Sequence, residues 1–281
     1  MACARLLLLL LAAASAAPAC YCIGAPHGAE AYQPYSTVIV DPDEFNTTTL
    51  GELTSQGKAV LAYINAGYAE EWRWYWPIAV QAGIVHEPTE YEGEHLVEYW
   101  SPAWRAILVN YTLSTLQQGY TGVYLDNIDA AEAIAELQPP WAQGVDPRQA
   151  MIDLVSNISS AAHASGGLVY VNIGAATSLL WDDRLLDQVD GVLREETLLT
   201  LQDTCKTRPA DPAEALETLY SLLHAKANGK DVIAVEYVDN RLEAWIAWLV
   251  YATLGFKPVL QPACDPDYTR PPLPTPWAPW P

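Results

Sequence analysis

The chain has 281 residues, of which 51% are apolar, and its 34 acidic and 14 basic residues give it a net charge of −20. A chain of this length can bury a sizeable core, in one large domain or two small ones. Its acidity argues against nucleic acid and anionic membranes as partners, because like charges repel, and favours a neutral or cationic partner.

The first residues have the features of a secretory signal peptide. Within 1–19, a basic residue is followed by an apolar run and then by small residues, and the run is too short to span a bilayer stably. We predict cleavage between residues 16 and 20, a secreted protein, and no stable membrane span once the signal is removed. A lipid anchor at Cys20 is the weaker alternative, since the two preceding residues fit a lipidation sequence poorly.

Four cysteines remain after the signal peptide. An even number in an oxidising compartment favours disulfides over a metal site. Four cysteines allow three pairings, and we prefer Cys205 with Cys264, because Cys20 and Cys22 lie together in an N-terminal arm over 20–36.

From residue 37 onward the sequence repeats one form: a short apolar run, a polar residue, a loop and a helical pattern. The ends of successive runs are 23 to 46 residues apart, which leaves room for crossover helices. Near-continuous apolar strands are typical of a parallel sheet covered on both faces. We therefore predict an α/β fold, a single-domain (β/α)8 TIM barrel over 37–264, with an open doubly wound sheet as the alternative. The eight runs end at Asp41, Asn65, Ser101, Asp126, Asn172, Glu195, Glu236 and Gln261.

Local signals place three of the helices and the end of the domain. Asp-Pro pairs open helices over 147–165 and 212–226, and a third helix follows a cap at Asp239 or Asn240. The run ending at Ser101 is the least regular of the eight, since its residues alternate between apolar and polar. The tail over 265–281 is rich in proline, so we predict that it is extended and peripheral.

The chemistry is expected at the strand ends. In a barrel of this type, residues just past the carboxyl ends of the strands converge on one cleft. Seven of the eight runs end in Asp, Asn, Glu or Gln, although any one of them could instead cap a helix. The histidines do not have zinc-ligand spacing, and no glycine-rich turn would cradle a phosphate, so we expect no metal and no cofactor.

Two carboxyl groups acting as acid and as base or nucleophile are what most glycosidases use. The chain has eleven Trp and sixteen Tyr against two Phe, a bias that suits stacking on sugar rings and hydrogen bonding to their hydroxyls. The sequence therefore predicts a glycosidase that acts on a polysaccharide.

Four segments between residues 58 and 239 stand out: "VLAYINAGYAEEWR", "GYTGVYLDNIDA", "VDGVLREE" and "GKDVIAVEYVD". Together they resemble the endo-α-1,4-polygalactosaminidases of glycoside hydrolase family 114. By that resemblance Asp126 and Glu195 are the catalytic carboxylates, and Glu196 leaves the second assignment open. The resemblance implies substrate contacts by Asp41, Tyr63, Asp129, Glu236 and Tyr237, and the strand-end positions add Asn65, Asn172 and Glu196.

The resemblance implies a secreted hydrolase that cleaves an amino-sugar polysaccharide similar to polygalactosamine. Such a polymer is cationic where it is deacetylated, and a cleft lined with carboxylates would attract it. Two alternatives stay open: a catalytically inactive carbohydrate-binding or adhesive barrel, and another reaction on carbohydrates carried by the same scaffold.

Overall fold

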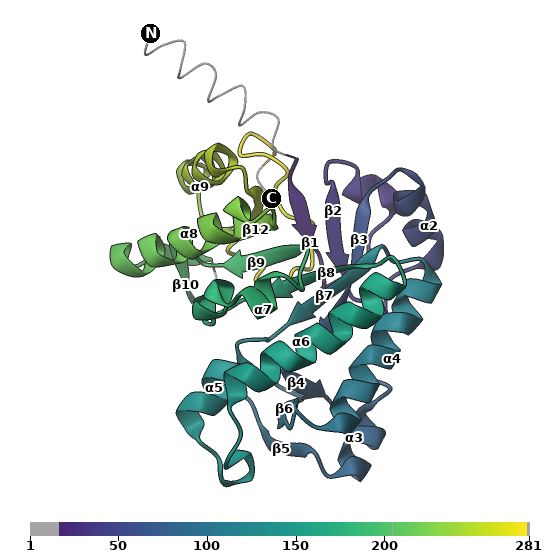
Figure 1. Cartoon of the computed structure of the whole chain (residues 1–281). Helices are drawn as coiled ribbons and strands as arrows, with labels where there is room; N and C mark the ends of the chain where they lie inside the picture. Colours follow the sequence, from purple (N-terminus) through teal and green to yellow (C-terminus); the bar gives the residue numbers. More distant parts are fainter. Residues whose placement is uncertain (1–16, 204, 280–281) are drawn as a thin grey trace. The chain divides into compact units, whose positions relative to one another are not determined.

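The computed structural model describes residues 17–203 and 205–279 (Figure 1). Most of the predicted signal peptide, residues 1–16, lies outside the described residues. None of the helices in the described ranges has the length and apolarity that a membrane crossing requires.

Eight parallel strands form one sheet in which the strand order follows the chain, β1-β2-β3-β7-β8-β9-β12-β13. The edge strands β1 and β13 pack against each other, and helices connect most of the successive strands, so the fold is a (β/α)8 barrel, as predicted. All residues of β2 and β7 are buried, as expected for strands covered on both faces. The strands are β1 (Ala19–Tyr21), β2 (Thr37–Val40), β3 (Ala59–Asn65), β7 (Gly122–Asp126), β8 (Leu168–Asn172), β9 (Gly191–Glu195), β12 (Asp231–Val238) and β13 (Lys257–Pro262).

The predicted helix starts are confirmed. The side chains of Asp146, Asp211 and Asn240 each accept a hydrogen bond from a backbone N–H in the first turn of the helix that follows. The α-helices are α2 (Thr47–Ser55), α3 (Trp76–Ala82), α4 (Pro102–Gln118), α5 (Ala130–Leu137), α6 (Pro147–Ala164), α7 (Asp183–Leu186), α8 (Pro212–Ala227) and α9 (Arg241–Leu254). The 3-10 helices within the described residues are η1 (Ala29–Tyr32), η2 (Pro140–Ala142) and η3 (Thr177–Trp181).

The contacts divide the chain into two compact parts. The first part consists of the residues up to 62 together with 191–281, and the second part is 63–190. The first part also contains an antiparallel hairpin of β10 (Leu199–Asp203) and β11 (Lys206–Pro209). In the second part α4 and α6 lie side by side (Figure 1). That part also holds a small antiparallel sheet of β4 (Tyr68–Glu70), β6 (Glu94–Val97) and β5 (Val85–Pro88).

The strand predicted to end at Ser101 is wrong. The chain forms β6 at Glu94–Val97 instead, between β4 and β5 in the antiparallel sheet. Ser101 does not end a strand, because its hydroxyl caps α4 through Ala103 N at 3.2 Å. The alternation over residues 96–100 therefore does not mark a strand, because only the first two of these residues belong to β6 and the chain turns at 99 and 100.

The eighth barrel strand is β1, which pairs in parallel with β2. It lies ahead of the predicted start of the barrel at residue 37, in a segment assigned to the signal peptide and the arm. With three residues it is too short to show a pattern in sequence. Its Cys20 is buried and is paired with Cys22 in a disulfide.

The proline-rich tail is not peripheral. Leu273 forms a β-bridge with Leu260 of β13, and the side chains of Asp265 and Tyr268 are buried. Proline prevents regular pairing but not packing, so composition alone could not reveal this contact. The last helix, α9, has an exposed apolar face that includes Trp245.

The preferred disulfide is confirmed: Cys205 of the β10–β11 hairpin is bonded to Cys264 at the start of the tail. Their separation is 59 residues, against two for Cys20 and Cys22. In the chain-entropy account a crosslink stabilises more when it closes a longer loop.

We expect that replacing Cys205 and Cys264 together by alanine lowers the free energy of unfolding by about 4 kcal/mol. The matched control replaces Cys20 and Cys22 by alanine and should lose less, because that pair closes a very short loop. Urea unfolding followed by tryptophan fluorescence measures both. Equal losses in the two variants would contradict an effect set by loop length.

Candidate functional site

In the first part, Glu195 ends β9, where it pairs with Val235 of β12. Its Oε2 accepts hydrogen bonds from the hydroxyl of Tyr237 at 2.8 Å and from that of Tyr268 at 2.5 Å. The two hydroxyl oxygens are also close to each other, but each hydroxyl has one proton, which it donates to Glu195. The carboxylate is therefore held by two neutral donors, one from the next strand of the sheet and one from the tail.

Glu196 is engaged differently from Glu195. Its backbone has a positive φ of 54°, and its side-chain Oε1 accepts the N–H of Leu201 in β10 at 2.6 Å. Burial raises the pKa of its carboxyl, against that hydrogen bond. β9 ends at Glu195, so the chain turns between the two glutamates, and the carboxylate of Glu196 anchors the hairpin.

Glu236 is fully buried, which does not suit the substrate contact expected from sequence. Its Oε1 accepts the backbone N–H groups of Thr197 and Leu198 at 2.8 and 2.7 Å, and Oε2 accepts that of Leu199 at 3.0 Å. The Tyr251 hydroxyl donates to Oε1. Burial raises the pKa of Glu236 to about 7, although these donors act in the opposite direction. Glu236 thus fixes the turn that follows the two glutamates.

Two further strand ends of the first part are occupied by local hydrogen bonds. Asp41, just past β2, accepts the N–H of Asp43 at 3.0 Å in an Asx turn. The buried Gln261 of β13 donates to the backbone oxygen of Asp265 at 2.7 Å, and so orders the start of the tail.

In the second part, Asp126 and Asn172 end the adjacent strands β7 and β8, and both are nearly buried. The Asn172 Nδ2 donates to Asp126 Oδ1 at 2.9 Å. Asp129 accepts the N–H of Ala175 at 2.9 Å. A Cβ at Gly174 would lie 2.0 Å from Asp129 Oδ2, so only glycine fits beside this carboxylate. The structure thus brings three predicted site residues of this part together around the ends of β7 and β8.

The end of β3 adds Tyr63 and Asn65, both buried. The Tyr63 ring centroid lies 6.1 Å from that of Tyr124, and the guanidinium carbon of Arg73 lies 5.9 Å from the Tyr63 centroid. Asn65 Oδ1 accepts the N–H of Tyr68 at 2.9 Å. Asn65 therefore orders the connection from β3 to β4.

The small antiparallel sheet and the turn that follows β4 contribute three charged residues that sequence reasoning missed. Glu70 and Arg73 form a buried ion pair with an N–O distance of 2.7 Å. Glu94 lies directly opposite Glu70 in the β4–β6 pairing. Burial, followed by the charges of Glu70 and Asp126, raises the pKa of Glu94 to about 7. Residues at opposed positions on paired strands lie close together, but the sequence could identify Glu70 and Glu94 as such a pair only if the β4–β6 register were known.

The tryptophan-rich segment that follows β3 has both buried and exposed aromatic side chains. Tyr75 is buried and donates to Glu70 Oε2 at 3.3 Å, whereas Trp72 and Trp74 are exposed. The exposed indoles are available for stacking on a sugar.

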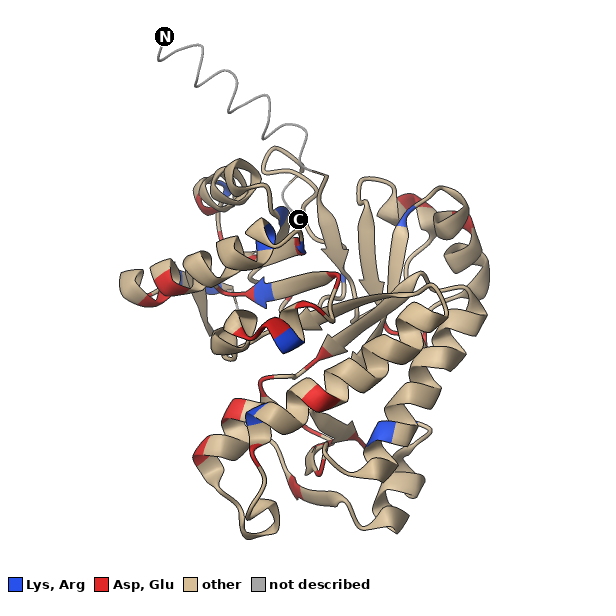
Figure 2. Ribbon diagram, in the orientation of Figure 1, with Lys and Arg blue, Asp and Glu red and all other residues tan. Residues whose placement is uncertain are grey.

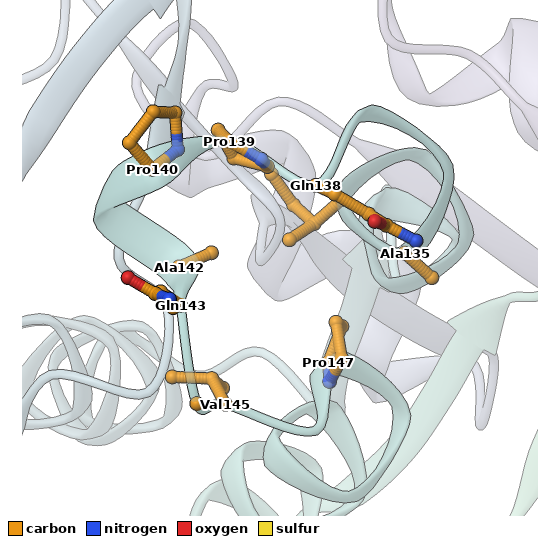
Figure 3. A pocket seen from close by; sticks show the side chains of 10 residues that line it. Ala135, Gln138, Pro139, Pro140, Ala142, Gln143, Val145 and Pro147 are labelled. Atoms are coloured by element: carbon orange, nitrogen blue, oxygen red, sulfur yellow. The ribbon is translucent and has the colours of Figure 1, made fainter.

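A groove of about 610 Å³ lies in the second part between the end of α5 and the start of α6 (Figure 3). Its lining is mainly proline, alanine and glutamine, and it includes no acidic side chain, so it does not have the chemistry of the predicted site. Among the described residues, no cluster of three or more His, Cys, Asp or Glu side chains could hold a metal ion.

The family model for glycoside hydrolase family GH114 matches residues 13–265 of the chain. An uncharacterized protein of Deinococcus radiodurans is 30% identical over 215 residues, which are 74% of this chain and 66% of that protein. An uncharacterized protein of Methanocaldococcus jannaschii is 29% identical over 73% of this chain and 60% of its own length. The matches therefore span somewhat less than two thirds of these relatives.

Two solved structures have the same fold. The Aspergillus fumigatus protein Ega3, in complex with galactosamine, has a TM-score of 0.66 and 18% identity, and the match covers 89% of this chain and 92% of Ega3. The glycoside hydrolase domain of PelA from Pseudomonas aeruginosa has a TM-score of 0.69 and 16% identity, with coverage of 89% and 96%. At these identities the likeness concerns the fold.

The raised pKa of Glu94 has a consequence for stability. A carboxyl whose pKa is about 7 in the folded state and 4.5 as a model value keeps its proton more tightly when folded, so folding loses stability as pH rises from 4.5 through 7. We expect Glu94→Gln to weaken the dependence of the free energy of unfolding on pH, by up to about 1.4 kcal/mol per pH unit. Thermal unfolding at pH 5, 6, 7 and 8 measures it. Glu92→Gln, at an exposed position of the same segment, is the control, and equal slopes in the Glu94 variant and the wild type would contradict the expectation.

The Glu236 contacts predict a graded loss of stability. Glu236→Ala leaves three backbone N–H groups without their acceptor and should lower the free energy of unfolding by about 3 kcal/mol or more. Glu236→Gln keeps the shape and one acceptor oxygen, so it should lose less. Urea denaturation compares the two variants. A glutamine variant as unstable as the alanine variant would show that shape and acceptor count do not decide the effect.

Proposed function

We propose that this chain, which belongs to glycoside hydrolase family GH114, is a secreted glycosidase. We propose further that it cleaves an amino-sugar polysaccharide through Asp126 and Glu195. The observation that carries the proposal is the environment of Asp126. It is a nearly buried carboxylate at the carboxyl end of a barrel strand, with an amide donor from the next strand. Burying such a charge is expensive, and barrel enzymes place their reactive groups at this end of their strands.

Glu195 is the proposed second carboxyl group. It also ends a barrel strand, is partly exposed, and has its position set by two hydroxyl donors. The engagement of Glu196 with the hairpin supports Glu195 rather than its neighbour for this role. In two-carboxylate hydrolysis one group protonates the leaving oxygen, and the other attacks the anomeric carbon or activates water.

The proposed substrate is a polymer of galactosamine or a related amino sugar. The chain has a net charge of −20, and acidic residues outnumber basic ones in both parts (Figure 2). An acidic protein attracts a polymer that carries protonated amines. Ega3, which shares the fold, binds galactosamine. Asp129, Asn172 and Tyr63 are the proposed substrate contacts of the second part, and Asp41 and Tyr237 those of the first.

Secretion is part of the proposal. The sequence begins like a signal peptide, and two disulfides require an oxidising compartment. Since β1 starts at Ala19, cleavage before that residue would leave the first barrel strand in the mature protein.

We expect Asp126→Asn and Glu195→Gln to fold like the wild type and to lose about 10³-fold or more in activity, because each removes a proton-transferring or nucleophilic carboxyl. The assay is reducing-end release from partially deacetylated galactosaminan, with neutral polysaccharides in parallel. Asp153→Asn and Glu217→Gln make the same chemical changes at exposed helix positions and serve as controls.

Full activity in either site variant would remove that residue from the catalytic pair. Binding of the polymer by the wild type without any cleavage would instead identify an inactive carbohydrate-binding barrel. Cleavage of a neutral polysaccharide alone would retain the hydrolase and overturn the amino-sugar substrate.

A further inference from the structure

The C-terminal tail reaches the candidate catalytic carboxylate through one side chain. Tyr268 donates to Glu195 Oε2 at 2.5 Å, and Tyr237 donates to the same oxygen at 2.8 Å. The rings of Tyr268 and Tyr237 have centroids 6.1 Å apart, and the edge contact of Tyr268 with Tyr21 has a centroid distance of 4.5 Å. Tyr268 thus lies between β12 and the end of β1, and its hydroxyl points toward Glu195.

The backbone around Tyr268 is fixed by a dense set of hydrogen bonds. The side chain of Asp265 accepts the N–H groups of Thr269 at 3.0 Å and Arg270 at 2.9 Å, and its backbone oxygen accepts that of Tyr268 at 3.2 Å. Tyr268 itself has a φ of 54°, a left-handed conformation that a tyrosine seldom adopts without support. The turn therefore holds this residue in one orientation.

Two further contacts place the turn on the barrel. A Cβ at Gly24 would lie 1.8 Å from the backbone oxygen of Asp267, so the N-terminal segment and the tail are in direct contact here. The Cys205–Cys264 disulfide ties the residue before Asp265 to the hairpin. The start of the tail is therefore held by the N-terminal segment and by the β10–β11 hairpin.

The two hydroxyls remain donors at any working pH. Burial, and then the charge of Glu195, raises the pKa of Tyr237 and of Tyr268 well above the ordinary value of 10. A phenol that keeps its proton can donate to the carboxylate but cannot exchange roles with it. These tyrosines can therefore orient Glu195 and stabilise its negative charge without titrating themselves.

We propose that Tyr268 is a positioning residue for Glu195 and that the C-terminal tail is a working component of the catalytic site. The proposal rests on the proposed catalytic role of Glu195. Tyr268 acts through Glu195 by fixing the orientation of its carboxylate, together with Tyr237. Removing one hydroxyl leaves the ring contacts in place and frees one of the two constraints on Oε2.

The test is Tyr268→Phe in the full chain, assayed for release of reducing ends from galactosaminan. A hydrogen bond to a charged group is worth enough that we expect kcat to fall about 10- to 100-fold, with KM changed less than about threefold. Tyr237→Phe should give a similar loss. The double variant should lose less than the product of the two, because both hydroxyls serve one oxygen.

Tyr35→Phe is the matched control. Tyr35 is also buried and its hydroxyl also donates to the tail, at the backbone oxygen of Pro272, but not to Glu195. If the tail matters only for stability, Tyr35→Phe and Tyr268→Phe should lower the melting temperature and kcat to the same degree. A Tyr268→Phe enzyme with the kcat of the wild type or of the Tyr35 variant overturns the proposal.

Failure of the proposed function has a different signature. A wild type that cleaves none of the polysaccharides tested refutes the glycosidase assignment whatever the variants do. In that case crystal structures of the wild type and of Tyr268→Phe test the positioning itself. An unchanged Glu195 side chain in the variant would then overturn it, and a displaced one would support it.

Discussion

Burial of carboxylates at the carboxyl ends of strands is the constraint on which the rest of this structure depends. A carboxylate removed from water is tolerated only where donors or cations replace the lost hydration. Each nearly buried acid of this region has such a partner: Asp126 has the amide of Asn172, Glu70 has Arg73, and Glu236 has three backbone N–H groups. The loops are therefore shaped as much by the needs of the acids as by the connections that they make.

Glu236 shows that a buried carboxylate at a strand end can have a structural role instead of a catalytic one. It has the residue type and the strand position of a catalytic acid, yet its carboxylate is enclosed by the turn that follows β9. Consecutive residues of a strand face opposite sides, so Glu236 and Tyr237 cannot both reach the same cleft. Tyr237 reaches Glu195, and Glu236 points toward Tyr251 of α9. Glu236, which was predicted to bind substrate, instead supports the turn that follows Glu195 and Glu196.

Much of the barrel could be predicted because its strands are long runs of buried apolar residues. Seven of the eight predicted runs are barrel strands, and helix caps at Asp146 and Asp211 marked their helices correctly. The errors came where a pattern was short or ambiguous. β1 has three residues, and β6 has four, in which two polar residues are followed by two apolar ones. Neither carries enough periodicity to reveal which sheet it joins.

The candidate site was predictable to the extent that it follows strand order. Asp126 stands directly after an apolar run, so its place at a strand end could be read from the sequence. Glu94 and Tyr268 could not be found in this way. Glu94 approaches Asp126 only through the register of the small antiparallel sheet, and Tyr268 approaches Glu195 only through a turn stabilised by Asp265. Both depend on contacts that are remote in sequence and have no local signature.

These contacts offer a second explanation for the high tyrosine content of the chain. Sixteen tyrosines against two phenylalanines suggested sugar stacking, but several of the tyrosines are buried next to acids. Tyr75, Tyr251 and Tyr268 donate to Glu70, Glu236 and Glu195, respectively. With 14 basic residues for 34 acidic ones, the chain has few cations with which to neutralise buried carboxylates. A phenol supplies a strong donor and a large apolar surface without adding charge, so it stabilises a buried acid while preserving the negative character that would attract a cationic polymer.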